Sequence, residues 1–170
     1  MKTRVLVLAA AALILATMTA AAQTGTWTAV GSTGTVNPPQ VALFTVFNGT
    51  RLGFTAGGTI PNTLVARFNV TNTWGGFESD APPWTLMEVG ALNTSTADPV
   101  SATLYRVNTC TGVRTAICTA TNTLGSSTGA CVSCSFASGT FNFTSSLYYV
   151  EVSITRADNA SPQLSTLRIH

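Results

Sequence analysis

The sequence has very few ionisable side chains. Charged residues make up 8% of its 170 residues, with one lysine, Lys2, and one histidine, His170. A nucleophile–histidine system needs an imidazole held by packing and by a second hydrogen bond, and a C-terminal histidine is poorly placed for that. A site built from several histidines is excluded within one chain. Carboxylates therefore remain the main candidates for acid–base chemistry.

The N-terminus has the order of a secretory signal peptide. A positive leader, residues 1–4, precedes an apolar run from Val5 to Met18, and Thr19-Ala20-Ala21-Ala22 offers small residues for cleavage before Gln23. The apolar run is too short to span a bilayer comfortably. We expect removal of residues 1–22, a single domain over residues 23–170, and a secreted or periplasmic protein with no membrane span after cleavage.

The expected mature chain carries no excess charge and no lysine. Without Lys2 and Arg4 it keeps six arginines against six acidic residues, a formal net charge of zero. Nucleic acids and anionic membranes are bound by concentrated positive charge. On charge alone we therefore expect neither as a partner.

Polarity comes mainly from hydroxyl groups, with 30 Thr and 14 Ser in the sequence. Threonine fits a pleated, half-exposed surface well. Apolar and aromatic residues recur throughout, which distinguishes the chain from a low-complexity segment and supplies surface to bury. The composition favours an all-β domain.

Alternation of apolar and polar residues predicts short strands separated by turn signals. The clearest are Leu64–Thr71 and Tyr148–Thr155; in the second, Tyr148, Val150, Val152 and Ile154 share the inward face. Further strands are expected at Thr26–Gly31, Val41–Phe47, Arg51–Thr55, Trp84–Ala91, Ser101–Asn108, Arg114–Thr121, Ala130–Phe136 and Leu164–His170. Asn48-Gly49 and Thr111-Gly112 are hairpin signals. The pattern predicts an antiparallel β-sandwich with Greek-key or jelly-roll-like connections.

Three stretches resemble a group of uncharacterised secreted bacterial β-sandwich proteins. They are Phe143–Arg156 with Pro162 to Ile169, Ala66–Asn72, and Ala102–Val107. The resemblance spans roughly residues 40–170 and rests on diffuse strand patterns. It implies bacterial export and a β-sandwich, and it carries over no activity and no catalytic residue.

Four cysteines, Cys110, Cys118, Cys131 and Cys134, lie close together in the sequence. In an exported protein they predict two disulfides. Pairing of Cys110 with Cys118 and of Cys131 with Cys134 is slightly favoured, and pairing of Cys118 with Cys134 across a hairpin is the main alternative. The spacing does not match a zinc ribbon, and Cys131-Val132-Ser133-Cys134 lacks the helix that a redox motif requires, so no metal or cofactor is expected.

The segment from Trp74 to Trp84 gathers aromatic and acidic residues in one loop. Trp74, Phe77, Glu78, Asp80 and Trp84 are the ligand-binding candidates. Aromatic rings stack on sugar C–H faces while carboxylates accept hydroxyl hydrogen bonds. Two alternatives stay open: a Ca²⁺ site at Glu78 and Asp80, or an ordered connection whose tryptophans cap the sandwich.

We expect the other carboxylates to have structural roles and not catalytic ones. Glu88 lies within an apolar strand and, if inward, needs a partner such as Arg106. Asp98 and Asp158 resemble turn residues that bond their own backbone. Glu151 is expected to face solvent.

These observations favour a non-enzymatic exported accessory protein. It would bind a glycan, a small ligand or a cell-surface partner through loops at one end of the sandwich. The first alternative is a fimbria-like surface subunit that assembles by strand addition, with Thr24–Thr35 as donor. The second is a carboxylate-dependent hydrolase centred on Glu78 and Asp80.

Overall fold

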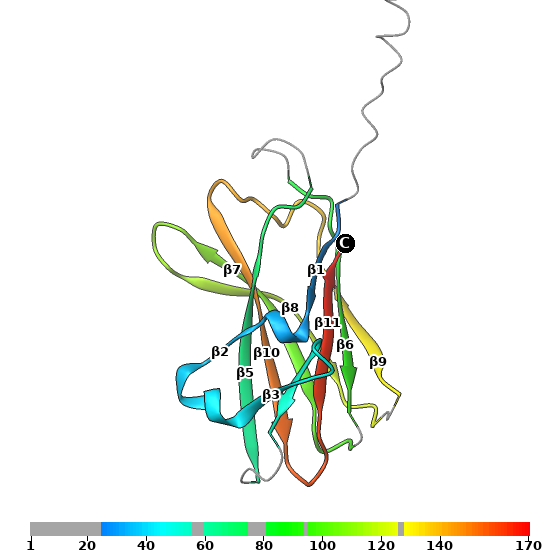
Figure 1. Ribbon diagram of the computed structural model, residues 1–170. Helices are drawn as coiled ribbons and strands as arrows, with labels where there is room; N and C mark the ends of the chain where they lie inside the picture. Colours follow the sequence, from blue (N-terminus) through cyan, green and yellow to red (C-terminus); the bar gives the residue numbers. More distant parts are fainter. Residues whose placement is uncertain (1–24, 56–59, 75–80, 94, 126–127) are drawn as a thin grey trace, which may run out of the picture.

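Two antiparallel sheets face each other in the computed structural model, which describes residues 25–55, 60–74, 81–93, 95–125 and 128–170. Figure 1 views them from the side on which β1, β2 and β3 lie in front. The predicted all-β, antiparallel sandwich is therefore confirmed. Residues 1–22, the expected signal peptide, lie outside the described residues.

Sheet A has six strands and sheet B has five. In sheet A the order is β3 (Phe44–Phe47), β4 (Arg51–Phe54), β11 (Gln163–Ile169), β6 (Leu86–Leu92) and β9 (Ala130–Ser135), and β1 (Trp27–Val30) also pairs with β11. In sheet B the order is β2 (Thr35–Val36), β5 (Asn62–Val70), β10 (Ser146–Arg156), β7 (Val100–Asn108) and β8 (Arg114–Asn122).

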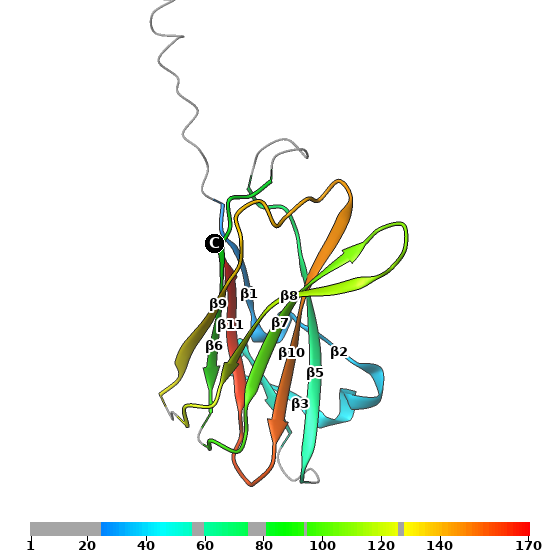
Figure 2. The same ribbon diagram turned by 180° about the vertical axis from the view of Figure 1, so that it is seen from behind.

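Strands β4 to β11 form a jelly roll. Their orders, β4-β11-β6-β9 in sheet A and β5-β10-β7-β8 in sheet B, follow from a chain that passes to the other sheet at nearly every connection. The exception is the β7–β8 hairpin, which projects from the body of the sandwich in both views (Figures 1 and 2). The predicted turn at Thr111-Gly112 lies at its tip, between the two strands.

Every strand predicted from alternation has a counterpart in the structure. Strand β10 buries Tyr148, Val150, Val152 and Ile154, as predicted. Asn48 and Gly49 both have positive φ, 51° and 72°, as a tight hairpin turn between β3 and β4 requires.

Two local features differ from the prediction. Val41 to Leu43 belong to a 3-10 helix, η2 (Pro38–Leu43), not to a strand. Pro38 and Pro39 explain the difference, since proline lacks the N–H of a ladder and is tolerated in the first turn of a helix. The short strand β2 was not predicted; it follows the 3-10 helix η1 (Gly31–Thr33) and pairs with β5 through only two residues.

The disulfide joins edge strands of opposite sheets. Cys118 of β8 bonds to Cys134 of β9, while Cys110 and Cys131 are exposed free thiols. The favoured local pairing, and the expectation of two disulfides, are therefore wrong, and the alternative pairing is confirmed for a different reason. Strand β8 pairs with β7 and β9 with β6, so the bond crosses between sheets and not within a hairpin.

Alternation explains why Cys131 does not pair with Cys134. Residues three apart on a strand point to opposite faces. Cys134 faces the core side and Cys131 the solvent. Cys110 lies outside the sheets, in the turn that follows β7.

No helix among the described residues is long and apolar enough to cross a membrane.

Candidate functional site

Trp84, one of the predicted ligand-binding residues, is buried in the hydrophobic core. Its side chain is 2% exposed and packs edge-on against Phe141, with ring centroids 5.0 Å apart. The indole N–H donates to the carbonyl of Gly25 at 2.5 Å. A ring in this position cannot stack on a sugar, so the prediction for Trp84 is wrong; it is a core residue near the end of the sandwich.

The rest of that loop stays a prediction. Trp74 is half-buried, and its backbone N–H donates to Asn72 Oδ1 at 3.0 Å. Phe77, Glu78 and Asp80 lie outside the described residues.

Glu88 does not point inward, and it does not pair with Arg106. Its neighbours Met87 and Val89 fill the core, so Glu88 lies on the outer face of β6. Its Oε2 is 2.9 Å from Arg168 Nε and 3.3 Å from His170 Nε2. The strand alternates as predicted, but in the register that exposes the carboxylate.

Asp98 and Asp158 connect two loops. Asp98 is fully buried and accepts from the backbone N–H groups of Ala157 and Asp158, so the expected bond to its own turn is wrong. Asp158 accepts from the N–H of Ala160, two residues on, as expected of a turn aspartate. Burial raises the pKa of Asp98, and the Ala157 N–H opposes that effect.

The described residues gather aromatic and charged side chains on the outer face of sheet B. Five outward residues, from four adjacent strands, form what we call the tyrosine–arginine surface: Arg67, Tyr105, Arg114, Tyr149 and Glu151. Alternation places them there, because their neighbours on β5, β7 and β10 are the inward core residues.

Strand register brings these residues together. Tyr149 of β10 lies opposite Tyr105 of β7, and Glu151 lies opposite Arg67 of β5. The two tyrosine rings stack, with centroids 5.2 Å apart and planes inclined by 22°. The Arg114 guanidinium lies 4.8 Å from the centroid of Tyr105. Both tyrosines are half-buried, so part of each ring reaches solvent.

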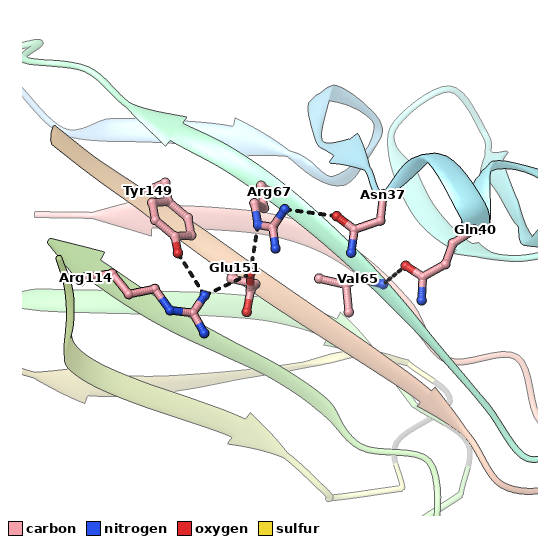
Figure 3. A network of polar contacts seen from close by, with 7 residues as sticks. All are labelled: Asn37, Gln40, Val65, Arg67, Arg114, Tyr149 and Glu151. Carbon is pink, nitrogen blue, oxygen red and sulfur yellow. Dashed lines mark hydrogen bonds and ion pairs between the residues drawn. The ribbon is translucent and has the colours of Figure 1, made fainter. Parts of the chain in front are cut away.

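Polar contacts fix the charged groups in place (Figure 3). Arg67 Nε lies 2.8 Å from Glu151 Oε2, and its Nη1 donates to Asn37 Oδ1 at 3.0 Å. Arg114 Nη1 donates to the Tyr149 hydroxyl at 3.2 Å and lies 3.7 Å from the same Glu151 oxygen. The hydrogen bond to Tyr149 is the main cause that raises the pKa of Arg114.

Helix η2 supports one side of this network. The Gln40 side chain donates to the Thr63 carbonyl at 2.7 Å and accepts from the Val65 N–H at 3.0 Å. These bonds substitute for a strand partner along part of the β5 edge and hold Asn37 beside Arg67 (Figure 3). The side chains of Asn37 and Arg67 are thus held in place by contacts within the chain.

Hydroxyl pairs and apolar side chains extend the same face. Cross-strand pairs join Thr103 to Thr119 and Ser101 to Thr121, each at 2.9 Å. Leu147, on the outward face of β10, is 61% exposed. Aromatic and apolar surface beside fixed hydrogen-bonding groups suits a ligand that has both C–H and hydroxyl faces.

A cleft adjoins this surface at Arg67. Its volume is about 780 Å³. The cleft runs along β1. On one side of that strand it extends towards β5, and on the other side it extends over the outer face of sheet A. Trp27 and Phe68 line it, and Phe68 lies close beneath the η1–β2 connection, where a side chain at Gly34 would collide with its ring at 2.4 Å. Glu88 and Arg168 line the other end.

The tyrosine–arginine surface was not predicted, because its residues are far apart in the sequence. One signal was available in the sequence, the alternation of inward and outward residues along β10. It places Tyr149 and Glu151 on the outward face of a strand whose position was predicted correctly. Their partners on β5, β7 and β8 follow only from the strand order, which alternation does not provide.

Comparisons with known proteins give distant likenesses. No family model and no curated protein matches the sequence. A carbohydrate-binding module, CBM36, in complex with calcium and xylotriose, aligns over 85% of this chain and 99% of its own, at 9% identity and a TM-score of 0.44. The xylan-binding module CBM15 aligns over 85% and 89%, at 10% identity and a TM-score of 0.43.

A third match is a larger protein. The CBM22-1–GH10 modules of Clostridium thermocellum endo-1,4-beta-D-xylanase 10B, complexed with xylohexaose, align over 87% of this chain and 26% of theirs, at 12% identity and a TM-score of 0.38. At such scores these likenesses establish no ligand and no activity for the present chain.

Proposed function

We propose that this protein is a non-enzymatic, exported binding module that holds a polysaccharide on the tyrosine–arginine surface. The observation that carries the proposal is the ordered network of Figure 3, in which stacked tyrosines lie beside arginine and glutamate side chains whose positions are fixed. Ordered groups lose little freedom on binding. Hydroxyl pairs beside them match the chemistry of a sugar chain.

A binding role is also supported by the chemistry of the surface. Retaining and inverting glycosidases use two carboxyl groups across the scissile bond. Within the described residues the tyrosine–arginine surface has one carboxylate, Glu151, and that group is ion-paired with Arg67. The hydrolase hypothesis concerned Glu78 and Asp80, which lie outside those residues, so it stays an untested alternative.

The fimbria-like alternative has less support. It required Thr24–Thr35 to act as a donor strand for another copy. Instead, Trp27–Val30 pairs with β11 of the same chain, and Thr35 pairs with Arg67 in β5. The described part of the donor segment is therefore already in use.

Export and bacterial origin remain part of the proposal. They rest on the signal-peptide pattern of residues 1–22 and on the resemblance to secreted β-sandwich proteins. The Cys118–Cys134 disulfide supports export, because disulfides persist in oxidising compartments.

The proposal is tested by affinity electrophoresis of residues 23–170 through gels containing xylan, galactomannan or mixed-linkage β-glucan. We expect at least one polysaccharide to retard the protein. Tyr149→Ala should weaken that binding about tenfold, which corresponds to about 1.4 kcal/mol. Tyr149→Phe, which keeps the ring, should lose less.

The matched control is Ser135→Ala, at an exposed position of β9 in sheet A, away from the tyrosine–arginine surface. It should bind as the unmodified protein does. Unretarded migration in all three gels would contradict the proposal, and so would equal losses of affinity in Tyr149→Ala and Ser135→Ala.

A further inference from the structure

Two arginines of the tyrosine–arginine surface share one carboxylate. Arg67 Nε lies 2.8 Å from Glu151 Oε2, whereas Arg114 Nη1 is 3.7 Å from that same oxygen. The close ion pair is therefore between Arg67 and Glu151. Within the described part of the chain, no other carboxylate pairs with Arg114, so the surface has one positive charge in excess.

The free part of the Arg114 guanidinium is open to a ligand. Both of its polar contacts use Nη1, and Nε and Nη2 contact no acceptor among the described residues. In Figure 3 the second terminal nitrogen points away from the network. The side chain is 54% exposed. A guanidinium has five N–H donors in a planar fork, so most of its donors here remain available.

Its orientation is nevertheless restrained. The guanidinium lies over the Tyr105 ring at 4.8 Å and is bonded to the Tyr149 hydroxyl. Stacking and a hydrogen bond together hold the plane beside the aromatic surface that a sugar ring would contact. An arginine fixed in this way loses little rotamer freedom when it binds.

We propose that Arg114 binds the carboxylate of a uronic acid substituent on the polysaccharide. The inference rests on the proposed function and specifies its ligand. A planar fork matches a planar carboxylate in a bidentate pair. Polyanions are bound by clusters of basic residues, whereas this surface offers a single excess charge. A largely neutral chain with occasional uronic acids fits that charge.

The test compares two forms of one polymer by titration calorimetry. Glucuronoxylan is titrated into the protein, and so is the same glucuronoxylan after chemical reduction of its carboxyl groups to alcohols. We expect the native polymer to bind about tenfold more tightly at low ionic strength. Raising the salt concentration should shrink that difference, because exposed charges are screened over about 10 Å at 0.1 M salt.

Variants locate the effect. Arg114→Gln should abolish the difference between the two polymers, and the readout is the ratio of the two affinities, because the substitution also alters contacts to Tyr105 and Tyr149 that both polymers share. Arg114→Lys, which keeps the charge but loses the fork, should retain only part of the difference. The control is Arg106→Gln, an exposed arginine on the other face of β7, which should retain the full difference.

The outcomes separate this inference from the function on which it rests. Equal affinity for native and reduced polymer, or an undiminished difference in Arg114→Gln, would overturn the role of Arg114 while leaving polysaccharide binding intact. Absence of binding to either polymer would overturn this inference; the gel series above then decides the broader function.

Discussion

Asp98 shows how one buried group can make stability depend on pH. As a carboxylate, its Oδ2 is buried and receives no hydrogen bond from the described residues. As an acid, the same oxygen can donate to the neighbouring Asp158. Burial is the main cause that raises the pKa of Asp98 above its ordinary 3.8, and the interaction with Asp158 adds to it.

We therefore predict that stability falls as pH rises from about 4 through the raised pKa of folded Asp98. In that window the folded protein holds a proton on Asp98 that the unfolded chain releases, so each step in pH favours unfolding. Asp158 has a lowered pKa, mainly through the Ala160 N–H, and its contribution is complete above about 4 and is lost only at lower pH.

The Asp98→Asn variant tests this prediction, since the amide imitates the neutral acid. The free energy of unfolding of the variant should be about 1 kcal/mol higher at neutral pH, because the amide no longer leaves the buried Oδ2 of Asp98 without a hydrogen-bond partner. Urea unfolding from mildly acidic to mildly alkaline pH measures both effects. An unchanged pH slope in the variant would refute the assignment to Asp98.

Trp84 was predicted to bind ligand, and its burial gives the opposite expectation for mutagenesis. Trp84→Ala should lower the free energy of unfolding by about 3–5 kcal/mol, because loss of a large ring leaves a cavity beside Phe141 and Phe143. Replacing the half-buried Trp74 by alanine should lower the free energy of unfolding by less. Thermal unfolding of both alanine variants makes the comparison, and a milder effect at Trp84 than at Trp74 would show that Trp84 is not in the core.

At the scale of the elements, the disulfide closes one open edge of the sandwich. Cys118 and Cys134 lie on the edge strands β8 and β9, at a sequence separation of 16. A bond that closes a loop of this length stabilises by about 3 kcal/mol in the chain-entropy description.

Replacing both Cys118 and Cys134 by serine should lower the free energy of unfolding by about that amount, which urea unfolding measures.

The pairing itself is tested by thiol labelling without reductant, followed by peptide mass mapping. Labelling should modify Cys110 and Cys131 and leave Cys118 and Cys134 unlabelled. Labelling of either bonded cysteine, or protection of both exposed ones, would contradict the pairing.

The strands were largely predictable, but their arrangement was not. Period-two alternation and turn residues such as Asn48-Gly49 identify where strands begin and end, since both signals are local. The inter-sheet disulfide and the tyrosine–arginine surface depend on strand order in the two sheets, which is a non-local property. Glu88 shows the same limit, because its outward orientation depends on the register of its strand.

At the scale of the whole molecule, the two sheets share one hydrophobic core. Leu104 and Val150 of sheet B and Val89 and Leu167 of sheet A are all at most 1% exposed and belong to one cluster. A shared core ties the stability of each sheet to the other.

We therefore predict one cooperative unfolding transition for residues 23–170. Far-ultraviolet circular dichroism reports the strands, and tryptophan fluorescence reports the buried Trp27 and Trp84. The two signals should change at the same urea concentration. Separate midpoints would contradict the single-domain interpretation.

Chemical-shift mapping by NMR tests the central claim, that the outer face of sheet B binds polysaccharide. The probe is a soluble oligosaccharide of the polysaccharide that retards the protein in the gel series, added to isotope-labelled protein. The account predicts shifts concentrated at Arg67, Tyr105, Arg114, Tyr149 and Glu151. Shifts confined to residues 71–84 or to sheet A, with these five residues unperturbed, would contradict it.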